Sequence, residues 1–481
     1  MISPTSGRSD AFDQETPERP GFDAFLCLDL LRGRTDPDAL RSREALVCFV
    51  QRRPSIPQPG RSLGRPRGKQ RCVGKSRQPK LAHPPPLVWN RRMLDYLRKL
   101  SPARQADLGR LSEEGLGVAA DRWDGFVERI GAGNLRAIYD GNELVAGCGF
   151  YDFGHWFGGQ RLASWGVSIV GVPPHRRGRG LGVQLMTELL TEARSLGVPL
   201  ASLFASTQVP YRRVGFEQAG TWMRHEAQLR ALPGGKPELP LHALTADSWR
   251  ETLAPIYETY AKRRAGLLDR SAGIWQRVID PHGTSAIRVY ACGPREALEG
   301  YVVFAQIGGA PFDLVLRDIV GLTPAAWQSL FAFLAGHRGA VDKMRWLGPA
   351  NEPLRLMFAE QEVQTVREDR WLLRIVDVER ALSERGYPLA ASGRLDLAVQ
   401  DELLTGNAGH WRLEVGDGQG HCTAGGDGRL RLGVATLATL FSGMVSARQL
   451  AEFGRIDGDD ATLALAEQFF AGSEPWLVDH F

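Results

Sequence analysis

The chain has 481 residues, of which 43% are hydrophobic and 24% are charged, so it has the composition of a globular protein and the length of about three domains. The sequence contains no run of about 18 apolar residues, the length needed to span a membrane. The first residues lack the basic-then-apolar order of a secretory signal. The six cysteines lie far apart and the ten histidines form no metal-binding pair, so we expect no disulfide scaffold, no metal and a reducing cytoplasm.

The net charge of +4 combines two unlike parts of the chain. Residues 1–92 carry a surplus of 9 positive charges, whereas residues 93–481 carry a net charge of −5. Residues 51–92 contain no Asp or Glu, are rich in Arg and Pro, and have no helical or strand period. We therefore expect a disordered basic extension over 1–92, with a basic arm for nucleic acid or an acidic partner as the alternative. The mildly acidic remainder suits a cationic amine substrate better than nucleic acid.

Residues 93–235 form the first predicted domain. Apolar residues at helical spacing predict helices over 94–111 and 118–130, and two apolar runs predict strands over 135–139 and 144–150. The turn between the strands contains Asp-Gly-Asn, which is typical of a hairpin. We therefore expect two helices in front of an antiparallel pair of strands.

A glycine-rich turn then joins a buried strand to a helix. Residues 166–172 are apolar and β-branched, two prolines end the strand, and residues 181–196 place leucines at helical spacing. The turn has the sequence Arg177-Gly178-Arg179-Gly180-Leu181-Gly182. Its glycines let a ligand approach the backbone, the first N–H groups of the helix are unpaired, and Arg176 and the arginines of the turn add positive charge. The turn therefore suits a diphosphate, although it has neither the Gly-Lys-Ser/Thr ending of a nucleoside-triphosphate loop nor the acidic partner of a dinucleotide fold.

The turn and the segment downstream of it resemble the GNAT family of acetyl-CoA-dependent N-acetyltransferases. Residues 177–182 match the family's motif A, Arg/Gln-x-x-Gly-x-Gly/Ala, and Tyr211 to Phe216 match the Tyr-x-x-x-Gly-Phe that follows the next strand in many members. In such members the tyrosine protonates the departing CoA thiolate. The purely structural alternative is that Tyr211 caps the core beside Phe216.

Residues 236–368 look like a weakened copy of the same unit. Strands are expected over 286–291, 300–306 and 312–320, and a helix over 324–335. In place of the Arg/Gly turn stands Leu322-Thr323-Pro324-Ala325. Because this segment lacks both the arginines and the paired glycines, the second copy should not bind CoA.

Residues 369–481 change character and resemble the sterol-carrier-protein fold. Strands are expected over 372–376, 393–399, 411–415, 422–424 and 429–432, and helices over 434–441, 447–453 and 459–470. The helical face with Leu437, Leu440 and Phe441 fits a plain core and a lipid tunnel equally well.

Two GNAT units, the second degenerate, followed by a sterol-carrier-like domain resemble the Eis (enhanced intracellular survival) family, with a mixed α+β and α/β fold. The resemblance spans residues 93–481, including the terminal Pro475-Trp476 and Phe481. It implies an acetyl-CoA-dependent N-acetyltransferase that acts on primary amines, such as aminoglycosides or lysine side chains, and assembles as a hexamer. The alternative is a lipid-binding protein whose GNAT unit is vestigial.

The resemblance also implies roles for individual residues. Tyr211 would be the general acid, and the C-terminal carboxylate of Phe481 would be the general base. Acetyl-CoA would contact two stretches of backbone and one serine beside its pantetheine arm, namely Val170, Gly171 and Val172, then Arg177, Gly178, Arg179, Gly180, Leu181, Gly182 and Val183, and Ser206.

The residues that would receive the acceptor are not marked by any motif. Trp123, Phe126, Trp156 and Phe157 are candidates for the acceptor pocket, and they fit an ordinary core as well. Cys148 stands in a predicted strand without a recognisable histidine partner, so we expect direct transfer without a covalent acyl-enzyme.

Overall fold

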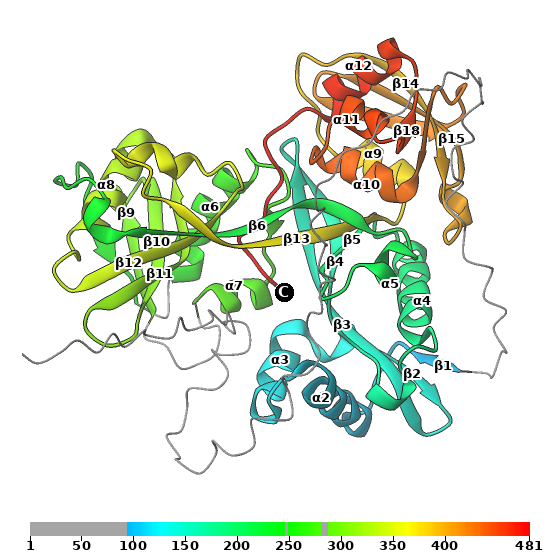
Figure 1. The fold of residues 1–481 in the computed structure, drawn as a ribbon, viewed down its shortest axis with the longest axis horizontal. Helices are drawn as coiled ribbons and strands as arrows, with labels where there is room; N and C mark the ends of the chain where they lie inside the picture. Colours follow the sequence, from blue (N-terminus) through cyan, green and yellow to red (C-terminus); the bar gives the residue numbers. More distant parts are fainter. Residues whose placement is uncertain (1–93, 246–248, 280–286) are drawn as a thin grey trace, which may run out of the picture. The chain divides into compact units, whose positions relative to one another are not determined.

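The computed structural model describes residues 94–245, 249–279 and 287–481, which Figure 1 draws in colour along the sequence. The expectation of a disordered extension over 1–92 lies outside the described residues. Within them, no helix is long and apolar enough to cross a membrane. The same part of the chain has no group of three or more His, Cys, Asp or Glu side chains that could hold a metal ion.

One 13-stranded sheet, counted over the described residues, runs through the first two regions of the chain. Its order is β1-β2-β3-β4-β5-β13-β6-β12-β11-β10-β9-β7, and β8 pairs with β3. The strands are β1 (Asp95–Leu97), β2 (Leu135–Asp140), β3 (Glu143–Phe157), β4 (Gln160–Gly171), β5 (Leu200–Phe204), β6 (Glu217–Gln228), β7 (Leu241–Ala243), β8 (Leu268–Asp269), β9 (Ile287–Cys292), β10 (Gly300–Ile307), β11 (Phe312–Gly321), β12 (Val341–Gly348) and β13 (Gln364–Ile375).

Strands β6 and β13 join the two halves of this sheet. Strand β6 pairs with β12 on one side and β13 on the other, and β13 also pairs with β5. Figure 1 shows these two long strands side by side. The prediction that residues 372–376 belong to the C-terminal sheet is therefore wrong, because Leu372 to Ile375 pair with β5. An apolar run predicts a strand but does not say which sheet will bury it.

The helices of the first region are α2 (Pro102–Leu116), α3 (Trp123–Ile130), α4 (Leu181–Ser195) and α5 (Val209–Arg212). The first of them begins later than the helix expected over 94–111. Residues 95–97 instead pair with β2 as strand β1, and Ser101 caps α2 by accepting the N–H of Arg104 at 3.5 Å. Pro102 fits the first helical turn, where its missing N–H costs nothing, so it fixes the start of the helix.

The second region repeats the strand–helix–strand order of the first. Its helices are α6 (Trp249–Ala261), α7 (Ala272–Ile279) and α8 (Pro324–Ala335). Strand β11, helix α8 and strand β12 follow one another as β4, α4 and β5 do, and both strand pairs are parallel. The expected weakened copy is thus confirmed as a second unit of the same topology.

The C-terminal region forms a sheet of its own. The five strands have the order β16-β15-β14-β17-β18, with bounds β14 (Gly393–Gln400), β15 (Gly409–Gly416), β16 (Gln419–Ala424), β17 (Leu430–Gly433) and β18 (Ile456–Asp457). The helices are α9 (Val378–Glu384), α10 (Val434–Ser442), α11 (Ala447–Glu452) and α12 (Asp460–Phe470). Leu437, Leu440 and Phe441 of α10 are all buried, and the Phe441 ring lies 5.0 Å from that of Phe157 in β3. This face of α10 is therefore core between α10 and the large sheet.

The last nine residues return from the C-terminal region to the large sheet. Figure 1 shows this segment in red, running down to the mark at the C-terminus. Thr221 in β6 donates its N–H to the Pro475 carbonyl at 3.1 Å, and its own carbonyl accepts the N–H of Leu477 at 2.9 Å. The N–H of Trp476 donates to the Ala265 carbonyl at 3.2 Å. These bonds dock the segment as a short strand, so its end is held rather than frayed.

Candidate active site

The Arg/Gly turn and the start of helix α4 bring together the groups expected of an anion cradle. Gly178 and Gly180 both have φ of 77°, a left-handed conformation that favours glycine. The N-cap of α4 is Gly180, which has no side chain to accept a hydrogen bond from the first N–H groups of the helix. The first helical bond runs from Gln184 N–H to Gly180 O, so the N–H groups of Leu181, Gly182 and Val183 come before it. Arg177 and Arg179 are exposed beside them, which leaves donors and positive charge facing solvent together.

Arg176 does not take part in this cradle, contrary to the expectation from the sequence. Its guanidinium hydrogen-bonds both carboxylate oxygens of Glu143 and lies 3.8 Å from Asp140. Hydrogen bonds from Arg176 and from His175 lower the pKa of Glu143 to about 2. The charge of Arg176 is thus offset by the hairpin between β2 and β3, which a linear pattern cannot reveal.

A bulge in β4 opens the sheet directly before the cradle. Gly147 pairs with Gly171 and Gly149 with Ser168, so β4 has one residue more than β3 between these pairs. Ile169 within the bulge has φ of 49°, which is rare for a β-branched residue. The parallel pairing of β4 with β5 ends at Val167 and Leu203, so residues 168–172 no longer have β5 as a partner. Val170, Gly171 and Val172 therefore lie beyond the point at which β4 and β5 cease to pair, which we call the opening between these strands.

Tyr211 packs against the same core cluster as several of the predicted CoA contacts. Val170, Val172, Val183, Ala205 and Tyr211 all pack against the same core cluster, which contains Cys148 and Leu185. Tyr211 lies in α5 just after β5, and its ring centroid is 6.1 Å from that of Phe216. Burial raises its pKa to about 12, so the phenol keeps its proton at neutral pH. Ser206 is exposed between β5 and α5.

Phe481 reaches the opening from the opposite face. Its ring lies 4.9 Å from Phe153 and 5.5 Å from Phe204, and a Cβ added to Gly166 would come within 3.0 Å of it. Leu203 and Phe204 are successive residues of β5, so their side chains point to opposite faces of the sheet. Leu203 belongs to the cluster beneath Tyr211, whereas Phe204 packs with the cluster that contains Phe481. Tyr211 and Phe481 thus lie on opposite faces of the sheet, on the two sides of the gap between β4 and β5.

Two interactions that the sequence does not mark fix the end of the chain. Asp479 is buried and accepts a hydrogen bond from Arg270 at 2.9 Å, and Arg270 also donates to Asp318 at 2.6 Å. Trp222 donates its indole N–H to the Val478 carbonyl at 3.3 Å. Arg270, Asp318 and Asp479 lie far apart in the sequence, so only the folded chain brings their charges together.

A buried histidine, His155, links the strands beside the C-terminal segment. His155 lies 2.6 Å from the Gly266 carbonyl through Nδ1 and 2.9 Å from the Ser202 hydroxyl through Nε2, and it stacks on Trp371. Since Nδ1 faces a carbonyl it must donate, which leaves Nε2 to accept the Ser202 proton. Burial lowers the pKa of His155 to about 4, so the ring is neutral. It bonds β3 to β5 and to the loop that receives Trp476.

The four aromatic candidates for an acceptor pocket are buried in packing contacts. Trp123 stacks on Phe126 at 5.6 Å, and Phe126 meets the Tyr151 ring edge-on at 6.3 Å. Trp156 belongs to a cluster with residues of the second region, and Phe157 packs against α10. All four serve as core, and the structure does not assign an acceptor pocket to them.

Comparisons with known families divide the chain in the same order as the fold. An acetyltransferase (GNAT) domain family matches residues 104–219, and another GNAT domain family matches residues 266–375. The sterol carrier protein domain family matches residues 378–478. Both copies of the repeated unit and the C-terminal region therefore have a counterpart among known domains.

Similar proteins extend over most of the described chain. An uncharacterized N-acetyltransferase of Streptomyces griseus subsp. griseus is 30% identical over 362 residues, which are 67% of this chain and 83% of that protein. N-acetyltransferase Eis of Mycobacterium tuberculosis is 25% identical over 363 residues, which are 72% of this chain and 87% of that protein.

Solved structures agree with these similarities. A GCN5-related N-acetyltransferase from Anabaena variabilis is 33% identical, with a TM-score of 0.78, and the match covers 81% of this chain and 100% of that one. Eis1 from Mycobacterium abscessus is 25% identical, with a TM-score of 0.68 and the same coverage. The matches thus include all three regions rather than one domain.

Proposed function

Because this chain belongs to the Eis-like family of GNAT N-acetyltransferases, we propose that it transfers the acetyl group of acetyl-CoA directly to a primary amine. The observation that carries the proposal is the placement of Tyr211 and Phe481 on the two sides of the gap between β4 and β5. A thioester held in that gap would be reached by an acid from one face and by an amine and a base from the other.

The diphosphate of acetyl-CoA would lie in the cradle at the start of α4. The N–H groups of residues 181–183 and the side chains of Arg177 and Arg179 would hold its charge. The pantetheine arm would pair with the backbone of residues 170–172, where β4 has lost β5 as a partner, and would pass the exposed Ser206. This placement brings the thioester to the point where the strands separate.

The reaction needs one proton removed and one supplied. The amine acceptor is mostly protonated at neutral pH, and the α-carboxylate of Phe481 would take its proton, directly or through a water. The free amine attacks the thioester carbonyl carbon, the C–S bond breaks, and the acetyl group remains on nitrogen. The Tyr211 phenol, which burial keeps protonated, would donate its proton to the departing sulfur.

A covalent route through Cys148 is disfavoured by its surroundings. The thiol is fully buried in β3, and burial raises its pKa to about 12, so it is not a thiolate at neutral pH. His155 on the same strand is occupied by Gly266 and Ser202 and cannot serve as its base. These contacts support direct transfer.

The test is an acetyl-CoA-dependent assay of thiol release with aminoglycosides, simple diamines and lysine peptides as acceptors. We expect free CoA to appear together with a product 42 Da heavier, on the order of one acetyl group per CoA released. Release without any acetylated product from these amines would contradict the assignment of the acceptor class. Hexameric assembly stays a prediction of the family resemblance, which sedimentation equilibrium would check.

A further inference from the structure

The second GNAT unit keeps a cavity where the first unit has its opening between strands. The cavity has a volume of about 700 Å³, within the usual range for small-molecule sites. Its walls come from the end of β11, the loop before α8, helix α6, the loop after β12 and the C-terminal segment. Pairing of β11 with β12 ends at Val315 and Arg345, so the cavity lies where these parallel strands have separated.

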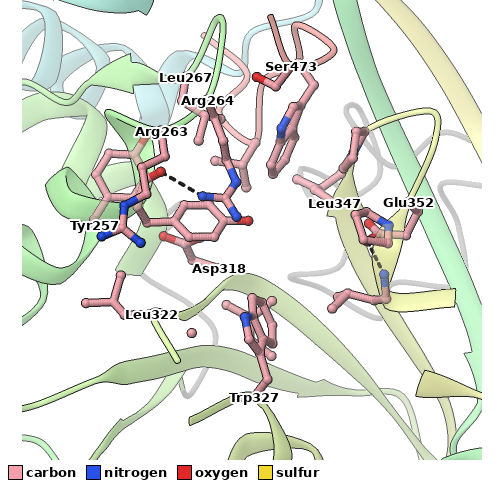
Figure 2. Close-up of a pocket in the computed structure, with 18 of the residues that line it drawn as sticks. Tyr257, Arg263, Arg264, Leu267, Asp318, Leu322, Trp327, Leu347, Glu352 and Ser473 are labelled. Atoms are coloured by element: carbon pink, nitrogen blue, oxygen red, sulfur yellow. Dashed lines mark hydrogen bonds between the residues drawn. The ribbon is translucent and has the colours of Figure 1, made fainter. Parts of the chain in front are cut away.

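Most of the wall is apolar or aromatic. The residues include Leu267, Leu322, Trp327, Leu347, Trp476 and Val478. Figure 2 shows Trp327 and Leu322 on one side of the space and Leu267 and Ser473 on the other. Such a lining suits a hydrocarbon or aromatic body, because burying apolar surface is favourable without directional contacts.

One wall carries a guanidinium that makes no close ion pair with a described carboxylate, although the Glu352 carboxyl attracts it from a longer distance. Arg264 lies over the Tyr260 ring at 3.2 Å and donates to the Tyr260 carbonyl at 2.9 Å, and it makes no ion pair with a described residue. Nearby Arg270, by contrast, is paired with both Asp318 and Asp479. Arg264 is half-buried and faces the cavity, so an anionic ligand would meet a partly desolvated positive charge there.

A second polar group on this wall lacks a partner. Tyr257 is 3% exposed, and its hydroxyl makes no hydrogen bond to any described residue. A buried hydroxyl without a partner is costly, so this part of the wall has an unmet hydrogen-bonding group. Tyr257 belongs to α6 and Arg264 follows that helix closely in the chain, and both line the cavity.

The carboxyl groups of the cavity do not oppose an anion strongly. The Asp318 carboxylate already accepts hydrogen bonds from the Arg270 guanidinium and from the Tyr301 hydroxyl, the latter at 2.6 Å. The Glu352 carboxylate accepts hydrogen bonds from the N–H of Leu354 at 2.8 Å and from the indole N–H of Trp346 at 3.1 Å. Burial raises the pKa of Glu352 to about 7. Glu352 is therefore partly neutral at physiological pH.

The helix that follows the loop cannot offer the cradle of the first unit. Thr323 caps α8 by accepting the N–H of Ala326 at 3.1 Å, and Pro324 has no N–H to give. The Thr323 hydroxyl also lies 2.5 Å from the carboxylate of Glu299, which would repel a diphosphate. The cavity is thus closed to CoA phosphates but open to a smaller anion.

We propose that this cavity binds an amphipathic carboxylate, that is, an acyl or aryl body that carries one carboxylate. The carboxylate would pair with Arg264, and the body would lie among the apolar residues. Ser473, Trp476 and Val478 form part of the wall, so an occupant touches the segment that ends at Phe481. The site is separate from the one proposed for acetyl-CoA and does not depend on it.

Calorimetry on the full chain with decanoate and with 4-phenylbutyrate tests the proposal, each measured against its neutral amide. We expect at least one carboxylate to bind roughly ten-fold more tightly than its amide, since hydrogen bonds to charged groups contribute more than neutral ones. The acid that binds better identifies an acyl or an aryl body. In Arg264→Gln the preference for the acid over the amide should disappear, while acetyl-CoA affinity stays as in the unaltered protein.

A second pair of variants covers the case in which Arg264→Gln does not fold. Leu322 is half-buried in the loop before α8 and lines the same cavity as Arg264. Leu322→Glu should abolish carboxylate binding by supplying a tethered competitor for Arg264, and its neutral match Leu322→Gln should retain most of it. Absence of binding by the unaltered chain at millimolar concentration, or binding that neither Arg264→Gln nor Leu322→Glu weakens, for example in the sterol-carrier-like region, would overturn the proposal.

Discussion

The two GNAT units share a strand architecture and differ in the turn that follows it. In the first unit β4 has an extra residue at 169–170, and in the second β11 has one at Arg317, between the pairs formed by Leu316 and Asp318. In both, the pairing with the parallel partner strand ends just before the bulge, at Val167 in β4 and at Val315 in β11. The first unit then has two left-handed glycines and an uncapped helix, whereas the second has a threonine cap and a proline.

This difference separates the features that maintain the fold from those that we propose bind phosphate. The bulge and the strand separation depend on backbone pairing and core packing, and both persist in the copy that lost its glycines. The proposed phosphate cradle would depend on free N–H groups and on φ values that only glycine adopts easily, so a few substitutions would remove it. The second unit thus has a cavity although it lacks the features proposed to hold a diphosphate in the first.

The largest expected effect comes from Gly180→Val in the first unit. The residue has φ of 77°, and a β-branched side chain would both strain the turn and cover the N–H groups of α4, so we expect roughly a 100-fold or greater loss of acetyl-CoA affinity. Isothermal calorimetry measures it. The matched control is Gly308→Val in the second unit, where φ is 95° and no atom lies within 4 Å of an added Cβ. Equal affinities of the two variants would contradict the assignment.

Tyr211→Phe should lower kcat by about 100-fold, the lower end for loss of a general acid, with little change in acetyl-CoA affinity. The phenol is protonated because burial raises its pKa to about 12, so its removal takes away a proton donor and leaves the ring that packs near Phe216. Steady-state thiol release gives kcat, and calorimetry gives the affinity. An unchanged kcat would leave Tyr211 as a core residue only.

Adding one alanine after Phe481 should lower kcat by about ten-fold or more, because it displaces the carboxylate by about 3.5 Å. Acetyl-CoA affinity should not change, since the cradle lies on the other face of the sheet. Phe481→Leu is the control: it keeps a carboxylate at the same position and loses only ring packing against Phe153 and Phe204. Full activity of the extended chain would place the base elsewhere.

The two halves of the molecule should respond oppositely to acid. Burial lowers the pKa of His155 to about 4, so the unfolded chain binds a proton that the folded chain does not, and stability falls as pH drops below about 6.5. Burial raises the pKa of Glu352 to about 7, so the folded chain binds a proton first and gains stability as pH falls from 7 toward 4.5.

Urea unfolding at pH 7.5 and 5.5 separates these contributions. The histidine effect is about 1.4 kcal/mol for one pH unit below 6.5. Glu352→Gln removes the opposing gain, so its loss of stability on acidification should be steeper than that of the unaltered protein. A shallower loss in this variant would show that Glu352 is not a raised carboxyl.

The smallest effect is expected for Cys148→Ala. The thiol is buried and protonated, and direct transfer does not use it, so turnover should stay within about two-fold while stability falls by about 1 kcal/mol for the lost contacts. Thiol-release kinetics and thermal unfolding measure both. An acetyl group trapped on Cys148 by mass spectrometry would reverse the direct-transfer proposal.

The amino-acid sequence by itself determined the repeated unit, the Arg/Gly turn and the order of the three regions. These features are local: a strand ended by prolines, glycines at φ above zero and leucines at helical spacing are decided within about 15 residues. For the same reason the loss of the turn at 322–325 was visible in the sequence.

Only the tertiary structure decided where the long-range partners lie. The pairing of β13 with β5, the neutralisation of Arg176 by Glu143, the Arg270–Asp479 pair and the cavity beside Arg264 all join segments that are distant in the chain. Neither periodicity nor motif encodes such contacts, because each depends on which surfaces the packed elements leave adjacent. The family resemblance predicted a role for Phe481 at the site, but its position across the sheet from Tyr211 follows from the docking of residues 473–481 along β6.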